Sequence, residues 1–305
     1  MSVFVAEELS EVLNTKVVIG RINMGLLNRI IIDDVLLDDQ SGQEMLKVTR
    51  LSAKFDIMPF FKGKISISSV QLFGFNINLR KETPDSPPNF KFVLDAFASK
   101  DTVKKENSLD LRINSILIRR GRMSYHVLSE EETPGKFNAK HIQLQNIIAN
   151  ISLKALSKDS LNLGIKRLSL DEKASGFSLK KMSLKLVANN KQTNIDNFTI
   201  ELPETSLKLD TIHLEYDSLK AFDRFTEQVH FSFRTLPSQV TLKDISPFVP
   251  ILSHFKEPVT LDMEVKGTVD QLTCSHLEIT ADDRQFRLRG DVSLQDLSRP
   301  QDAYV

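Results

Sequence analysis

Apolar and polar residues alternate along most of this chain, but the alternation slips by one position again and again. Residues 65–79, ISISSVQLFGFNINL, show the pattern, with apolar residues separated by steps of two, then three, then two. Residues 111–125, LRINSILIRRGRMSY, repeat that spacing further along the chain. A period of two is typical of a β-strand with one apolar and one polar face. The pattern therefore predicts strands that share one irregularity.

The step of three predicts a bend in each strand. In an unbroken strand it would turn every later apolar residue to the wrong face. A β-bulge or a tight corner restores the facing and bends the strand, and polar residues between the apolar ones predict a wet second face. We therefore expect an all-β fold with a few short helices, whose long, curved, mostly antiparallel sheet forms an elongated apolar groove. The spacing recurs at residues 30–37, 46–53, 137–144, 163–170, 177–184, 193–200, 207–214 and 272–279.

Helical patterns are few and short. Residues 3–13 are amphipathic, and residues 89–98 have a helical spacing with Asn89 as the expected N-cap. A Ser-Pro pair predicts the start of another helix over residues 246–255, and residues 56–61 fit a single turn.

The pattern also suggests two regions. We place a boundary near Ser238, so that residues 1–238 form an N-terminal groove region and residues 239–305 begin a following groove segment. Three strands are expected in that last segment, and the absence of a closing element predicts that the chain is part of a longer protein. The three strands cover residues 259–269, 272–281 and 286–294.

The composition favours a dry apolar surface and gives no case for nucleic-acid binding. Lys+Arg and Asp+Glu are both 40 among 305 residues, so net charge gives no case for nucleic acid. The aromatic residues are 19 Phe and 3 Tyr with no Trp, and Phe offers apolar area without a hydrogen-bonding group. No apolar run approaches the roughly 18 residues of a membrane span, and the first residues do not resemble a signal peptide.

Catalytic motifs are absent from the sequence. It contains no H-E-x-x-H, P-loop or G-x-G-x-x-G, so we expect no enzyme, no metal and no cofactor. Cys274 lies on the apolar phase and is expected in the core, while Arg119, Arg120 and Arg122 are expected on a solvated face. Three pairs of neighbouring carboxylates are expected at bends and turns: Asp33-Asp34, Asp38-Asp39 and Asp282-Asp283. The histidines are expected to be solvated strand residues: His126, His141, His213, His230, His254 and His276.

The apolar face is too large to remain uncovered. About 16 strands at a spacing of about 4.8 Å give a sheet about 75 Å long, with an apolar face on the order of 1,500–1,900 Å². Soluble monomers seldom expose more than a few hundred Å² in one patch. Either the sheet folds onto itself as a sandwich or barrel, or it forms a trough that an apolar ligand fills.

The sequence resembles the N-terminal region of the AsmA-like family, and within it the TamB type of Bacteroidetes-like bacteria. The likeness is carried by a strand "I-x-I-x-D-V-x-L-x-D", the stretch "L-x-V-x-x-L-x-A-x-F-D", a turn "P-F-F-x-G-K" and "I-x-I-x-x-V-x-L-x-G". The elements "D-I-S-P-F-V-P" and "V-K-G-T-V-D-Q-L" favour the TamB type. In this chain these motifs cover residues 30–38, 46–56, 59–64, 65–74, 244–250 and 265–272.

The resemblance implies a non-enzymatic lipid-transfer protein related to the chorein-type bridge-like proteins. Its expected place is the periplasm, with an inner-membrane anchor helix outside this chain and membranes at both ends. Its expected cargo is phospholipid or another acyl-chain lipid, moved for outer-membrane biogenesis. The alternative is a scaffold with a self-packed core that docks outer-membrane proteins, such as a β-barrel, through a sheet edge. The expected lipid-facing residues are Ile30, Ile32, Val35, Leu37, Ile65, Ile67, Val70, Leu72, Phe75, Ile77, Leu79, Leu111, Ile113, Ile116, Ile118, Ile142, Leu144, Leu168, Leu170, Met182 and Leu184.

Overall fold

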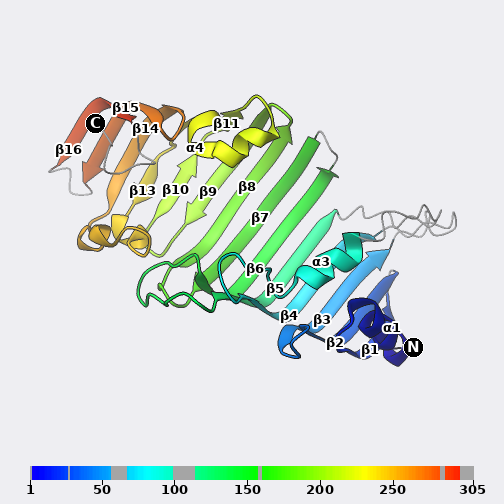
Figure 1. Ribbon diagram of the computed structural model, residues 1–305. Helices are drawn as coiled ribbons and strands as arrows, with labels where there is room; N and C mark the ends of the chain where they lie inside the picture. The colour runs from blue at the N-terminus through cyan, green and yellow to red at the C-terminus, as the bar shows by residue number, and fades with distance from the viewer. Residues whose placement is uncertain are drawn as a thin grey trace. The chain divides into compact units, whose positions relative to one another are not determined.

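The fold is mostly β, as predicted, with a few short helices. A computed structural model describes residues 2–26, 28–55, 67–98, 114–156, 160–281 and 286–295. Sixteen strands form one mixed, mostly antiparallel sheet, in which β1 to β9 follow one another in chain order (Figure 1). The predicted turn at residues 56–61 lies outside the described residues.

Within the described residues, the first part of the chain supplies seven strands and two helices. β4 and β5 form a parallel pair, and α3 lies in the connection between them. The elements are α1 (Ser2–Leu13), β1 (Val17–Gly25), β2 (Arg29–Asp38), β3 (Glu44–Phe55), β4 (Ile67–Lys81), α3 (Lys91–Ala98), β5 (Ser115–Val127), β6 (His141–Leu156) and β7 (Ser160–Glu172).

The second part of the chain supplies nine strands and short helical segments. The three strands expected after residue 259 are confirmed as β14, β15 and β16. The elements are β8 (Ser178–Asn189), β9 (Gln192–Glu201), β10 (Ser206–Leu209), β11 (Ile212–Glu215), η2 (Leu219–Arg224), α4 (Phe225–Gln228), β12 (His230–Arg234), β13 (Ser238–Val240), η3 (Leu242–Ile245), η4 (Pro250–His254), β14 (Val259–Gly267), β15 (Gln271–Ala281) and β16 (Arg287–Gln295).

The chain divides into two compact units. The first comprises Met1–Asn150 and Leu170–Phe177, and the second comprises Ile151–Ser169 and Ser178–Val305. This division does not coincide with the boundary expected near Ser238, which begins β13 and pairs with Leu261 of β14. The expected boundary between an N-terminal groove region and a following groove segment stays a prediction.

In the second unit, two strands are interrupted at the slip in the pattern. β10 and β11 both pair with β9 on the edge opposite β8, and only Asp210 and Thr211 separate them. β12 and β13 likewise share one edge of β14. β10 pairs with β13, and β11 pairs with β12. β10 and β11 together therefore take the place of one long strand, and β12 and β13 take the place of another.

The step of three is explained by backbone conformation. At five of these steps, and at a further step of three from Leu144 to Ile147, the second residue between the two apolar positions has a positive φ between 53° and 64°. A left-handed residue in a strand redirects the chain and restores the facing of the next apolar residue. In β9 and β15 the strand pairing also shifts by one, as expected of a β-bulge. The six residues are Asp34, Gly74, Arg120, Asn146, Asn197 and His276.

In the first unit the bends of neighbouring strands lie in one row. Asp33 pairs with Arg50 and Val35 with Val48, so the register is the same before and after the bend. The steps of three in β2 and β3 therefore lie opposite each other. The same holds for β3 with β4 and for β4 with β5, which places Gly74 beside Thr49 and Arg120. Thr49 Oγ1 donates a hydrogen bond to the Gly74 carbonyl at 3.0 Å. The prediction that successive strands bend at a similar height is confirmed for β2–β5.

Two helix predictions need correction. The helix after the loop at residues 82–90 begins at Lys91, and Asn89 is not its cap. The Asn89 side chain instead accepts a hydrogen bond from the Arg80 amide and donates to Asp39. The helix expected over residues 246–255 is only the 3₁₀ segment Pro250–His254. A proline disfavours the helical conformation of the residue before it, and Val249 lies outside the helical region (φ −131°, ψ 88°).

Candidate functional site

Three rows of apolar side chains cross β1–β5 on one face of the sheet. Directly paired residues of neighbouring strands lie on the same face, so the pairing register defines each row. We call this surface, with its continuation onto the parts of β6 and β7 that belong to the first unit, the apolar face. The rows are Met24, Ile30, Ala53, Val70 and Ile116; Ile22, Ile32, Leu51, Leu72 and Ile118; and Val17, Leu37, Leu46, Ile77 and Met123.

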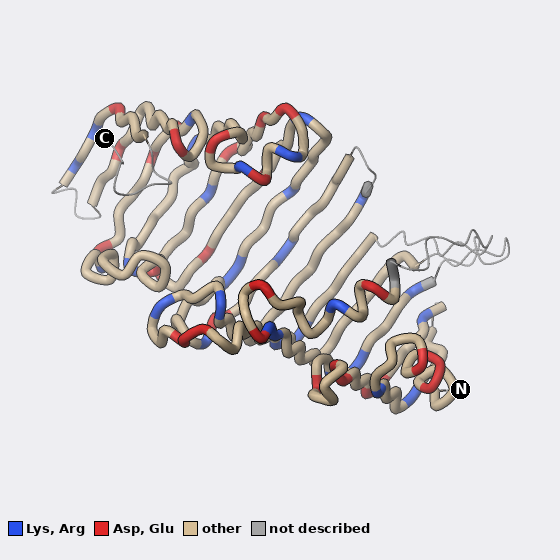
Figure 2. The backbone as a smooth tube through the Cα atoms, in the orientation of Figure 1, with Lys and Arg blue, Asp and Glu red and all other residues tan. Residues whose placement is uncertain are grey.

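We call the opposite face of the same strands the polar face, because one row across it is mostly charged. This row runs through Arg21, Asp33, Arg50, Phe73 and Arg119. Arg50 Nε donates to Asp33 Oδ1 at 2.6 Å, and this hydrogen bond holds the pKa of Asp33 below its usual value. The exposure expected for Arg119 and its basic neighbours is confirmed. In Figure 2, charged residues of both signs are spread over strands and connecting segments.

Nearly all the predicted lipid-facing residues are half-buried. Among those described, only Leu37 and Phe75 are buried, each 7% exposed. Side chains enclosed between two packed layers are mostly buried, so half-burial indicates contact with neighbours in the sheet and access from above. The half-buried residues are Ile30, Ile32, Val35, Ile67, Val70, Leu72, Ile77, Leu79, Ile116, Ile118, Ile142, Leu144, Leu168, Leu170, Met182 and Leu184.

The protein itself covers the apolar face at β1–β3. There α1 and α3 contribute side chains to a cluster centred on Val17, Ile19 and Leu37. Ile32 also packs against this cluster, so two predicted lipid-facing residues belong to a packed group that includes side chains of the protein's own helices. The helix residues are Val5, Ala6, Leu13, Phe92 and Val93.

A second cluster continues across the sheet without a helix among its described members. Its buried centre is Val48, Phe75 and Ile147, and every member comes from β2–β7. The Phe75 side chain lies over Gly121, where an added Cβ would meet the ring. The half-buried members are Val35, Leu46, Leu51, Leu72, Ile77, Ile118, Met123, Leu144 and Leu170.

The structure does not gather every predicted residue into this surface. Ile65, Leu111 and Ile113 lie outside the described residues. Leu168, Met182 and Leu184 belong to the second unit. There Met182 lies opposite Ile200, which in turn lies opposite Leu207, so that unit has an apolar row of its own.

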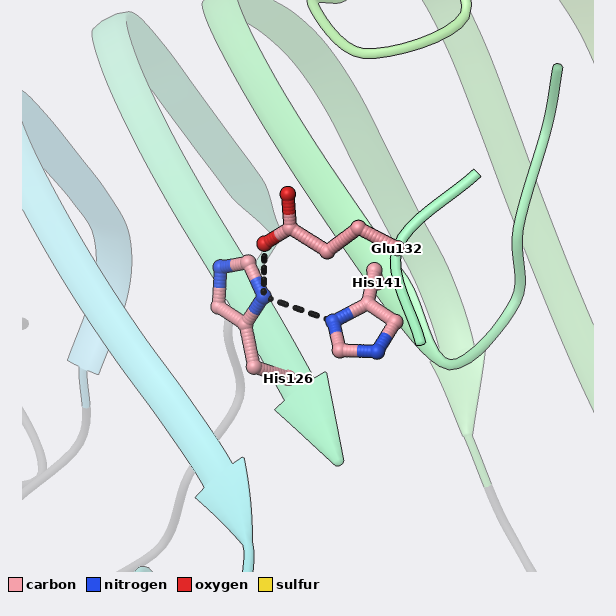
Figure 3. Close-up of side chains that lie close together, drawn as sticks. All are labelled: His126, Glu132 and His141. Carbon is pink, nitrogen blue, oxygen red and sulfur yellow. Dashed lines mark hydrogen bonds and ion pairs between the residues drawn. The ribbon is translucent and has the colours of Figure 1, made fainter. Parts of the chain in front are cut away.

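The histidine prediction is wrong for His141, which is buried and 6% exposed. It lies beside His126 and Glu132, and one potential ligand atom from each falls within 4.8 Å of the others (Figure 3). The two histidines are 15 positions apart in the sequence, and the alternation within each strand gives no sign that they meet. Cys274 is buried as predicted, and burial raises the pKa of its thiol.

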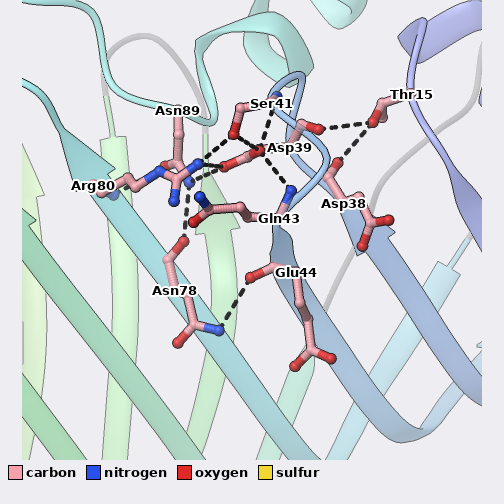
Figure 4. A network of polar contacts seen from close by, with 9 residues as sticks. All are labelled: Thr15, Asp38, Asp39, Ser41, Gln43, Glu44, Asn78, Arg80 and Asn89. Carbon is pink, nitrogen blue, oxygen red and sulfur yellow. Dashed lines mark hydrogen bonds and ion pairs between the residues drawn. The ribbon is translucent and has the colours of Figure 1, made fainter.

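A second polar centre fixes the edge of the apolar face beside α3. Asp39 is 2% exposed, and its carboxylate accepts hydrogen bonds from the Ser41 hydroxyl at 2.6 Å and from Arg80 Nη2 at 2.7 Å (Figure 4). Asn89 Nδ2 donates to the same carboxylate at 3.2 Å. The backbone amides of Ser41 and Gln43 complete the set. Asp39 thereby joins the β2–β3 turn to β4 and to the segment before α3.

Glu172 has the same role at the end of β7. It is 3% exposed and accepts hydrogen bonds from the Gln143 amide at 2.9 Å and from the Ser175 amide at 2.7 Å. Burial alone would raise the pKa of either carboxyl group. Hydrogen bonds outweigh burial in both cases and hold the pKa values of Asp39 and Glu172 below their usual range.

We expect stability to fall on acidification through these two groups. A carboxyl group whose folded pKa is lowered stabilises the fold above its unfolded pKa of about 4, and that contribution is lost as the pH falls through the folded pKa. Asp39→Asn should cost about 1–3 kcal/mol at pH 7 and should show a smaller further loss at low pH. Thermal unfolding between pH 7 and pH 3 measures both effects.

The control for this prediction is Asp38→Asn. The neighbouring Asp38 takes part in the network through its backbone carbonyl, which accepts a hydrogen bond from Thr15 Oγ1. The stability of Asp38→Asn should therefore depend on pH as that of the wild type does. Equal profiles for Asp39→Asn and the wild type would contradict the assignment.

Comparisons with known proteins leave the family open. No protein-family model matches the chain, and no curated protein is similar enough to count as a match. Within the described part of the chain, no helix has the length and apolar character of a membrane-crossing segment.

Proposed function

We propose that this chain binds acyl-chain lipid on its apolar face and serves as a non-enzymatic segment of a lipid-transfer protein. The observation that carries the proposal is the set of apolar rows across β1–β5, whose side chains are mostly half-buried. Away from α1 and α3, the described cluster on this face contains strand residues alone. An exposed surface of this kind requires an apolar partner.

Acyl chains suit the apolar face better than a ligand with defined polar groups. The rows on β2–β5 consist of aliphatic residues, Ala and Met, and Phe75 lies between them. Burial of methylene groups is non-directional and contributes about 0.8 kcal/mol each, so a chain of about sixteen carbons gains roughly 10 kcal/mol before ordering costs. Neighbouring positions along such rows are nearly equal in energy, which permits sliding.

The sequence resemblance supports a more specific form of the proposal. AsmA-like and TamB-type proteins are taken to carry phospholipid between the inner and outer membranes. On that basis we propose the periplasm as the compartment, phospholipid as the cargo and membranes at both ends as partners. The scaffold alternative requires a sheet edge instead of the apolar face.

Native mass spectrometry of the purified chain tests the proposal. We expect adducts with the masses of phospholipids, and we expect them to disappear after detergent washing and to return after incubation with phospholipid vesicles. A chain that stays free of lipid under both conditions would contradict the proposal and would favour the scaffold alternative.

A further inference from the structure

Two histidines and a glutamate meet where β5 ends and β6 begins. His126 is next to last in β5, His141 is the first residue of β6, and Glu132 lies in the segment that connects them (Figure 3). The Nδ1 atoms of the two histidines are 3.0 Å apart. Glu132 Oε1 is 3.9 Å from His126 Nδ1. All three side chains therefore direct a potential ligand atom toward one point.

The hydrogen bond of the His141 ring determines which of its two nitrogens has a free lone pair directed toward that point. His141 Nε2 lies 2.9 Å from the backbone carbonyl of Glu130. A carbonyl oxygen only accepts, so Nε2 carries the hydrogen and Nδ1 of the neutral ring presents its lone pair. Metal-binding histidines commonly donate their second ring N–H to a backbone carbonyl in this way, which holds the ring in its ligating orientation.

The connecting segment is shaped around this arrangement. The amide of His141 donates to the Asn138 carbonyl at 3.0 Å, and Asn138 Nδ2 donates to the Glu131 carbonyl at 3.1 Å. Lys140 Nζ forms an ion pair with the Glu130 carboxylate at 2.7 Å. These contacts hold the backbone beside His141, while Glu132 extends from an exposed part of the segment and its side chain is 62% exposed.

We propose that His126, Glu132 and His141 form a site for a divalent transition metal, with zinc the best match and water completing the coordination. Two nitrogen ligands and one carboxylate suit Zn²⁺, and ligands about 2.0–2.1 Å from a tetrahedral zinc lie about 3.3 Å from one another. The two Nδ1 atoms need to separate only slightly from 3.0 Å, and the exposed Glu132 side chain moves inward from 3.9 Å. His126 then carries its ring hydrogen on Nε2, so the neutral ring changes tautomer without losing a proton overall.

Metal-binding measurements on the chain without an added histidine tag test this proposal. Zn²⁺ is titrated in competition with a chromophoric chelator, and Co²⁺ is added separately to record its visible spectrum. The wild type should bind one equivalent of Zn²⁺ and give the intense visible bands of tetrahedral Co²⁺ with nitrogen ligands. Glu132→Gln should weaken Zn²⁺ binding at least about tenfold, and His126→Gln about a hundredfold or more.

His213→Gln is the matched control. His213 Nε2 also lies beside a carboxylate, 3.0 Å from Glu215, yet within the described ranges it belongs to no group of three ligands. This variant should bind Zn²⁺ as the wild type does. The proposal is overturned if the wild type binds less than one equivalent, if His126→Gln and Glu132→Gln bind as tightly as the wild type, or if His213→Gln loses as much affinity. Because Glu132 is exposed, its replacement tests binding without threatening the fold.

Discussion

Replacement of Ile116 by Asp is expected to abolish lipid binding while the sheet stays folded. Ile116 lies opposite Val70 of β4, in the row that continues through Ala53 and Ile30. Its side chain is half-buried and belongs to neither packed cluster of the first unit. A substitution there changes the surface offered to a ligand more than it changes the protein's own packing.

The expected size of the effect follows from the desolvation of a charge. A bound acyl chain would remove water from the new carboxylate without providing a hydrogen bond, which costs several kcal/mol. Each step of about 1.4 kcal/mol is a factor of ten in affinity, so a cost of several kcal/mol should lower the affinity for lipid by about a hundredfold or more. The phospholipid retained in native mass spectrometry and the rate of transfer of a fluorescent lipid between vesicles measure the loss.

The next residue along β5 provides the control. Leu117 is also half-buried, but it lies on the polar face and pairs with Gln71. It lines a hollow of about 520 Å³ together with Arg21, Arg50 and Arg119 and with Asp33 and Asp34. The three arginines outnumber the two carboxylates there, so the hollow can accept an added carboxylate. Leu117→Asp should therefore keep the wild-type lipid content. A folded Ile116→Asp protein that retains its lipid would contradict the assignment of the apolar face and would favour docking through a sheet edge.

Periodicity was sufficient to predict the facing of the strands but insufficient to predict their neighbours. The six left-handed positions include Asp34, Gly74 and Asn146, residue types that tolerate a positive φ, so composition at each slip offered a signal. Arg120 has no such tendency, and only its place beside Gly74 in the parallel pair explains it. Parallel pairing of β4 with β5 depends on contacts across a long connection, which local patterns do not encode.

Side-chain partners distant in sequence were the least predictable feature. Asn89 precedes a helix and has the residue type of a cap, yet its side chain joins Arg80 and Asp39, 9 and 50 positions away. His126 and His141 meet because a connecting segment returns the chain to the neighbouring strand. Two histidines at the two ends of one connection are a signal that sequence reasoning could use once the strands are known.

The last prediction concerns the packing of Phe75 against Gly121. Phe75 is 7% exposed, and Phe75→Ala should cost about 3–5 kcal/mol, because it leaves a void between Val48 and Ile147. A Cβ added at Gly121 would lie 2.5 Å from Phe75 Cε1 and 3.0 Å from Ile147 Cβ. Gly121→Ala alone should therefore cost about 1–3 kcal/mol through overpacking.

The double variant separates a specific contact from general sensitivity of the cluster. In the double variant the methyl group that Gly121→Ala introduces would enter the void left by the ring. The double variant should therefore lose about 1–3 kcal/mol less stability than the sum of the losses in the two single variants. Phe73→Ala on the polar face of the same strand is the control. Its ring is 37% exposed beneath Arg120, so the loss should stay below about 1 kcal/mol. Urea unfolding measures the free energy of unfolding of all four variants. Strictly additive costs would mean that the Phe75 ring does not pack on Gly121. That result would contradict the packing of β4, β5 and β6 into one apolar surface.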